Sequence, residues 1–174
     1  MVGAGPAGLE CAAALGRRGY DVALAEKNRE LGGRVTLESR LPGLSAWARV
    51  RDHRLQLLQK LGNVEIFRES ELSAQDILDL GYDDVVLATG ATWRRDGTGG
   101  SSRLGIAGIA AARPYTPDDI MAGVDLPSPV VIYDDDHFYM ANVMADLLVQ
   151  QNKEVVFVTP LNEVASWSRN TLEQ

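Results

Sequence analysis

The chain has 174 residues, enough for one sizeable domain or two small ones. With 45% hydrophobic and 24% charged residues, the composition is typical of a globular protein. The net charge of −7 argues against nucleic acid or an anionic membrane as a partner. No apolar run approaches the roughly 20 residues that span a bilayer, and no signal peptide is recognisable, so we expect a cytoplasmic protein. The one cysteine, Cys11, excludes an internal disulfide and a Cys-x-x-C redox pair.

A glycine-rich motif opens the chain. Gly3, Gly5 and Gly8 have the G-x-G-x-x-G spacing of a dinucleotide-binding loop. The first glycine allows a tight turn, the second lets the backbone approach a pyrophosphate, and the third lets the next helix pack against the sheet. A helix is predicted over 7–18 with Pro6 in its first turn, and its free N–H groups and dipole favour an anion. The strand that normally precedes such a loop has almost no residues here, so we expect a piece of a longer protein.

A buried strand is predicted over 21–25, with Glu26 at its end. Glu26 lies 18 residues after Gly8, where a carboxylate can accept hydrogen bonds from the ribose hydroxyls of an adenosine. Further on, the pair ending in Gly33 allows close backbone approach, and Arg34 can offset pyrophosphate charge. The alternative interpretation is an ordinary helix–strand turn with a surface glutamate.

The rest of the chain is predicted to continue the alternation of strands and helices. In chain order we expect a helix over 46–61, a strand over 64–67, a helix cap at Ser73 with Asp76, a buried strand over 84–90, a loop over 91–113, a strand over 130–133, a helix over 139–151 and a strand over 155–158. The prediction is therefore an α/β fold of two Rossmann-like βαβ units, truncated at both ends. Residues 1–125 would form a FAD/ADP-binding-like domain that lacks most of its first strand, and residues 126–174 a partial NAD-binding-like domain.

The second unit lacks the glycines of the first. Asp134, Asp136 and Tyr139 stand where the three glycines of the first unit stand. Together with Asp135, these carboxylates would repel a phosphate, so we expect this degenerate loop to bind no NAD(P)H. Two other interpretations are a metal site that includes His137 and a plain helix cap. We favour a helix cap that also excludes nucleotide.

Several segments together resemble the C-terminal region of the trimethylamine, dimethylamine and histamine dehydrogenase family, over nearly the whole chain. They are Gly3–Glu10, Glu30–Val35, Ala88–Gly90, Trp93–Gly97 and Tyr133–Met140, with Val158-Thr159-Pro160, Trp167 and Thr171 among the more specific parts. The related NADH:flavin oxidoreductases of the 2,4-dienoyl-CoA reductase type share the first half but keep glycines in the second.

The resemblance implies a flavoprotein parent. Full-length members carry an N-terminal (β/α)₈ barrel with FMN and a 4Fe–4S cluster, where amines are oxidised before electrons pass to an electron-transfer flavoprotein. Their C-terminal part resembles the FAD and NAD domains of glutathione reductase and holds ADP structurally, without a flavin ring. This chain has no barrel and no cluster-binding cysteines, so we expect it to bind ADP or FAD and to be inactive alone. We also expect a homodimer.

The resemblance also implies site residues, position by position. The expected nucleotide-binding residues are Gly3, Ala4, Gly5, Pro6, Ala7, Gly8, Glu26, Lys27, Gly33, Arg34, Val35, Glu71, Leu72, Thr89 and Gly90. The glycine loop and residues 33–35 would enclose the phosphates, Glu26 would hold the ribose, residues 71–72 would flank the adenine, and residues 89–90 would line the far side. No catalytic residue and no metal ligand is expected.

Three functions remain open. The first is an ADP-binding, non-catalytic part of a flavin-linked amine dehydrogenase, which explains one intact and one erased phosphate loop. The second is a FAD-binding fragment of an NAD(P)H-dependent reductase, which the acidic residues 134–136 disfavour. The third is a stand-alone adenine-nucleotide-binding module. Because most of the first strand is missing, unpaired ladder groups would favour dimerisation or aggregation of the isolated chain.

Overall fold

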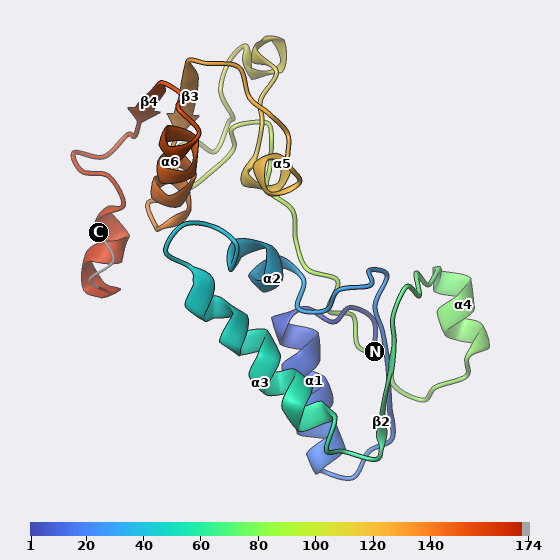
Figure 1. The fold of residues 1–174 in the computed structure, drawn as a ribbon. Coiled ribbons are helices and arrows are strands. Elements are labelled where there is room, and N and C mark those ends of the chain that lie inside the picture. The colour runs from blue at the N-terminus through green and yellow to red at the C-terminus, as the bar shows by residue number, and fades with distance from the viewer. Residues whose placement is uncertain (172–174) are drawn as a thin grey trace. The chain divides into compact units, whose positions relative to one another are not determined.

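The computed structural model describes residues 1–171, which form two compact units (Figure 1). Unit 1 comprises 1–40 and 44–91, and unit 2 comprises 41–43 and the chain from residue 92 onward. Each unit contains a two-stranded parallel sheet with helices, which confirms the predicted α/β class. The division concerns packing alone, so the domain boundary expected at 125/126 stays a prediction.

Unit 1 is built around a short parallel sheet. Its elements are α1 (Pro6–Arg17), β1 (Val22–Ala25), α2 (Arg34–Glu38), the 3-10 helix η1 (Ser45–Trp47), α3 (Ala48–Leu58), β2 (Val64–Phe67) and α4 (Ala74–Asp79). β1 pairs with β2 in register Val22 to Val64. On the other side of β1, Val2 forms parallel bridges to both Ala25 and Leu87, so a single residue takes the place of a central strand.

The buried strand predicted over 84–90 is wrong in its extent and its burial. Val2 N donates to Val86 O at 2.9 Å and Ala88 N donates to Val2 O at 2.8 Å, so pairing is limited to one bridge. Val85 and Leu87 are 46% and 68% exposed. A strand needs a partner along its length, and the neighbouring first strand here offers only Val2.

The core of unit 1 lies between the sheet and the pair α1 and α3, which lie side by side in Figure 1. Leu9, Ala12 and Ala13 recur at helical spacing on the buried face of α1, because positions three and four apart share one side of a helix. They pack with Leu24 of β1 and Leu58 of α3. This packing fixes α1 against the end of β1, where the glycine loop lies.

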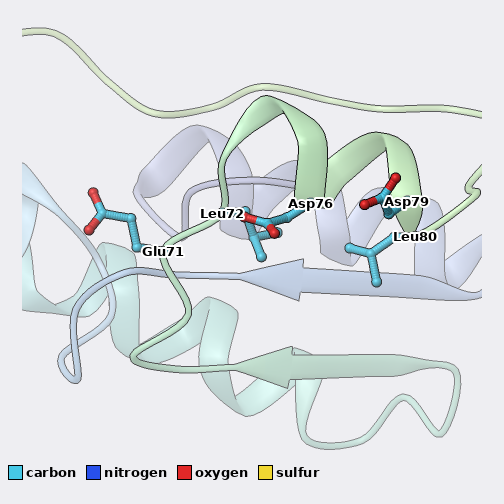
Figure 2. A pocket seen from close by; sticks show the side chains of 5 residues that line it. All are labelled: Glu71, Leu72, Asp76, Asp79 and Leu80. Atoms are coloured by element: carbon cyan, nitrogen blue, oxygen red, sulfur yellow. The ribbon is translucent and has the colours of Figure 1, made fainter.

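Helix α4 confirms the predicted cap. Ser73 Oγ accepts from Asp76 N at 3.2 Å, and Asp76 Oδ2 accepts from Ser73 N at 2.8 Å, which makes a reciprocal capping box. In Figure 2 the helix runs beside the strands in roughly the same direction, with Leu80 directed toward them.

Unit 2 contains the predicted second βαβ unit. Its elements are η2 (Ile109–Ala112), α5 (Pro117–Met121), β3 (Val130–Tyr133), α6 (Met140–Gln150), β4 (Val155–Val158) and η3 (Ser166–Thr171). β3 and β4 pair in parallel in register Val130 to Val155, and α6 packs on both strands. The buried residues of α6 are Met140, Met144 and Leu148. Within residues 1–171 no helix combines the length and the apolar character that crossing a membrane requires.

Candidate nucleotide-binding site

Two of the three motif glycines are required by the packing of the protein itself. Gly3 has φ +98°, and a Cβ there would lie 2.4 Å from the carbonyl oxygen of Ala88. A Cβ on Gly8 would lie 1.9 Å from the carbonyl oxygen of Gly3. The turn that follows Val2 therefore excludes a side chain at Gly3, and the contact of α1 with that turn excludes one at Gly8.

Gly5 differs from both. Its backbone (φ −71°, ψ −177°) is one that any residue adopts, and within residues 1–171 a Cβ there would meet nothing beyond its chain neighbours within 4 Å. Gly5 is the N-cap of α1, makes no side-chain cap, and is followed by Pro6. The first N–H groups of a helix have no intrahelical acceptor, so this end of α1 can receive an anion in the open space at Gly5.

Glu26 lies at the end of β1 and is only 7% exposed. Its Oε2 accepts from Ala4 N at 2.8 Å, which joins it to the glycine loop. Its Oε1 accepts from both the backbone N and the side-chain Nδ2 of Asn28, each at 2.9 Å. The motif spacing predicted Glu26 at the end of a strand, where the structure has it, and its role at a ribose stays a prediction. The spacing gave no signal for Asn28, because contacts within a turn leave no periodic pattern.

The segment before α2 lies against the glycine loop. Gly32 N donates to Ala4 O at 2.8 Å. A Cβ on Gly33 would lie 3.1 Å from the Cα of Gly5, so the two backbones almost touch. This close approach puts residue 33 and the start of α2 beside the open end of α1.

The residues that follow Gly33 differ in accessibility. Arg34 is the first residue of α2; its Nη2 donates to Ala91 O at 2.8 Å, and its Nη1 lies 3.9 Å from Glu38. Its side chain is about one-third exposed, and its positive charge lies on the segment that meets the loop. Val35 is buried, so it supports the segment by packing.

Three further residues were predicted to contact the nucleotide: Thr89, Gly90 and Lys27. The Cα of Thr89 would lie 3.1 Å from a Cβ on Gly3, so Thr89 is next to the loop. Gly90 has φ +81° with open space beside it, and Lys27 is exposed next to Glu26.

Glu71 and Leu72 follow β2 in unit 1, where Leu72 also lines a cavity of about 190 Å³ with Val2 and Ala25. They line a shallow depression of about 390 Å³ with Asp76, Asp79 and Leu80 of α4 and its end (Figure 2). No residue of the glycine loop lines this depression. Three of its five lining residues are carboxylates, and their negative charge suits a neutral ring better than a phosphate. A hydrogen bond from Ser73 lowers the pKa of Asp76, which keeps that group ionised. The role of residues 71–72 at an adenine stays a prediction.

In unit 2, the predicted helix cap by the acidic residues is wrong. The N-cap of α6 is Tyr139, without a side-chain cap. Asp134, only 2% exposed, accepts instead from the backbone N of Asp136 at 3.2 Å and of His137 at 3.0 Å. The turn, in which His137 has φ +62°, keeps this carboxylate on the residues before the helix. Burial and the charge of Asp134 raise the pKa of Asp136.

The same turn is covered by a loop of unit 2. Asp135 accepts from Ser101 N at 3.0 and 3.1 Å, and a Cβ on Gly99 would lie 2.0 Å from Asp135 Oδ2. His137 Nε2 lies 3.3 Å from Ser101 Oγ, while its Nδ1 lies 3.8 Å from Asp134 Oδ2. No group of three or more His, Cys, Asp or Glu residues suited to a metal ion occurs within 1–171.

Comparisons with known proteins cover most of the chain. Residues 1–67 match a family described as an NAD(P)-binding Rossmann-like domain. Dimethylamine dehydrogenase from Hyphomicrobium sp. (strain x) is 36% identical over 167 residues, which are 91% of this chain and 23% of that protein.

Two solved structures are similar to nearly the whole chain. Histamine dehydrogenase from Rhizobium sp. 4-9 is 47% identical with a TM-score of 0.90, over 99% of this chain and 27% of that one. 6-Hydroxypseudooxynicotine amine oxidase from Pseudomonas geniculata N1 is 44% identical with a TM-score of 0.94, over 99% of this chain and 26% of that one. The chain thus spans about a quarter of the length of these relatives.

Proposed function

We propose that the chain is part of a protein related to the dimethylamine and histamine dehydrogenases, to which it is 36% and 47% identical over most of its length, and that it binds ADP structurally at the glycine loop of unit 1. In this proposal it is the non-catalytic, nucleotide-binding part of a flavin-linked oxidoreductase that acts on amines. The chemistry of this part is recognition and charge neutralisation, because ADP carries no redox group.

One observation carries the proposal: the contrast between Gly5 and the other two motif glycines. The fold itself excludes a side chain at Gly3 and at Gly8, but nothing within residues 1–171 excludes one at Gly5. A bound group that approaches the backbone at the N-terminus of α1 explains why this position also carries no Cβ. A diphosphate suits that place, since the helix N-terminus offers N–H donors and positive potential.

The surrounding residues fit the other parts of the nucleotide. Arg34 lies on the segment whose backbone reaches Gly5, where its charge can offset that of a diphosphate. Glu26, tied to Ala4 of the loop, can accept a hydrogen bond from a ribose hydroxyl. Both features are compatible with ADP and with the ADP half of FAD.

The alternative function is a FAD-binding part of an NAD(P)H-dependent reductase, and unit 2 argues against it. There the N–H groups of Asp136 and His137 already donate to the Asp134 carboxylate, which takes the place of an anion. The 99–101 loop packs on the same turn. We propose that unit 2 binds no dinucleotide.

The whole protein is proposed from its relatives and from the sequence resemblance. We propose that a barrel with FMN and a 4Fe–4S cluster, outside this chain, oxidises an amine and passes electrons to an electron-transfer flavoprotein. We further propose a cytoplasmic homodimer.

The test is to identify what the purified chain carries. The chain is denatured, the supernatant is analysed by mass spectrometry, and the absorption spectrum of the native protein is recorded beforehand. A colourless protein that releases ADP supports the proposal, and a yellow protein that releases FAD supports the alternative. A chain that releases neither and also binds neither added ADP nor added FAD contradicts both.

A further inference from the structure

The Glu26 carboxylate is almost saturated by bonds from the protein itself. An ionised carboxylate offers about four acceptor positions, two on each oxygen. The two bonds from Asn28 fill both positions of Oε1, and the bond from Ala4 N fills one of Oε2. One position remains, on Oε2, so Glu26 can accept one further strong hydrogen bond rather than the two that its residue type suggests.

Asn28 decides which oxygen is left. The terminal torsion of a glutamate is broad and roughly two-fold, so an unrestrained carboxylate presents either oxygen. Asn28 donates two hydrogen bonds to Oε1, each 2.9 Å long, one from its backbone N and one from its side-chain amide. Because the facing atom is an acceptor, the amide must present its NH₂ group there.

The position of Asn28 is itself fixed from the neighbouring strand. Asn28 O accepts from Glu69 N at 3.4 Å, and Ser70 N donates to Glu26 O at 2.9 Å, so the turn after β1 is joined to the chain after β2. Glu26 N donates to Phe67 O at 2.8 Å, which anchors the residue at the sheet edge. The side chain of Asn28 is exposed and contributes nothing to the core.

We propose that Asn28 is a positioning residue for ribose recognition: it holds Glu26 Oε1 so that Oε2 alone accepts a single ribose hydroxyl. The inference rests on the proposed function and adds its specificity. In this proposal the hydroxyl is the ribose 2′-hydroxyl. The site selects adenosine diphosphates by it and rejects a 2′-phosphate ester, because a phosphate would face a buried carboxylate without a donor.

The test measures a ratio of affinities. Titration calorimetry gives the Kd of ADP and of 2′-deoxy-ADP for the full 174-residue chain and for its variants. A hydrogen bond to a charged acceptor distinguishes the two ligands, so we expect the wild-type chain to prefer ADP by about ten-fold or more. The variant N28A keeps the backbone donor and loses the amide, and N28D keeps the shape but replaces the donor by a repelling carboxylate.

The proposal predicts that the preference for ADP over 2′-deoxy-ADP falls to about three-fold or less in both variants. Without the amide donor, Glu26 is no longer held with one oxygen directed at the hydroxyl. The matched control is N63A. Asn63 also lies in unit 1 and donates through its amide, to Gly16 O and Tyr20 O, so its loss affects stability while the ratio stays at the wild-type value. Thermal melting of each variant confirms that it is folded at the titration temperature.

The possible outcomes separate the two claims. A wild-type chain that binds no ADP overturns the proposed function and the role of Asn28 with it. A wild-type chain that binds ADP but does not prefer it to 2′-deoxy-ADP, or one whose preference persists in N28A and N28D, overturns the role of Asn28 alone. A ratio that falls equally in N63A also overturns it, because the effect is then one of general stability.

Discussion

Replacing Gly5 by alanine separates folding from binding. The backbone at Gly5 already has the conformation of an L-residue, and the added Cβ meets nothing within residues 1–171 beyond its neighbours. Removing a glycine from the unfolded chain under these conditions stabilises a protein by about 0.4–1 kcal/mol. Alanine is a poorer N-cap than glycine, and this loss at the start of α1 opposes the gain by a similar amount. We therefore expect the ligand-free variant to melt within a few degrees of the wild type.

Nucleotide binding should respond in the opposite direction. The Cβ occupies the space through which a diphosphate approaches the N-terminus of α1, so at least one charge-assisted hydrogen bond is lost, which is worth about 1.5–3 kcal/mol. ADP at about 100 times its Kd stabilises a folded protein by about 2.7 kcal/mol, equivalent to about 5–10 °C for a chain of this size. Gly5→Ala should lose most of this shift.

The assay is a thermal melt with and without ADP, with Gly8→Ala as the contrasting variant. A Cβ on Gly8 would lie 1.9 Å from a backbone oxygen, so this change should cost about 1–3 kcal/mol or more in folding free energy without any ligand. A Gly5→Ala chain that keeps its full ADP shift would refute the assignment of the open space to a phosphate. A ligand-free Gly5→Ala chain as unstable as Gly8→Ala would refute the reading of the loop geometry.

Three further predictions concern single carboxylates. Glu26→Ala should weaken ADP binding by about 1–3 kcal/mol through the lost charged hydrogen bond, and an unchanged Kd by calorimetry would exclude its ribose role. Asp136→Asn should stabilise the chain at neutral pH. Burial and the charge of Asp134 raise the pKa of Asp136, so its ionisation opposes folding as the pH rises through that pKa. Denaturant titrations should show that the gain in unfolding free energy vanishes below the usual aspartate pKa range, where both states are protonated. Asp119→Ala should destabilise unit 2 by about 1 kcal/mol near pH 7, because bonds from Arg95 and the start of α5 lower the pKa of Asp119 to about 2. That loss should shrink as pH falls toward this value, and a constant difference would contradict the assignment.

Regular patterns predicted most of the fold. The helical spacing of Leu9, Ala12 and Ala13 and the apolar run before Glu26 predicted α1 and β1 to within a residue or two. The same reasoning gave β2, β3, α6 and β4. Helix α5 was missed although its signature was readable: Pro117 at the first helical position and a reciprocal Thr116–Asp119 box begin it.

Other features depend on partners that a pattern does not contain. The apolar run over 84–90 has the composition of a buried strand, but its burial requires neighbouring elements along its whole length. The Asp134 carboxylate suits a helix N-terminus, yet the turn at His137 directs it to nearer N–H groups. In the site, spacing identified Glu26 and the glycines, whereas Asn28 became visible only from its two donors to one carboxylate oxygen.

A crystal structure of the chain with ADP tests the central claim most directly. The account predicts that the diphosphate lies over Gly5 at the N-terminus of α1 and that a ribose hydroxyl lies within hydrogen-bonding distance of Glu26 Oε2. A nucleotide bound at the 134–137 turn, or a space beside Gly5 that stays closed to ADP at saturating concentration, would contradict it.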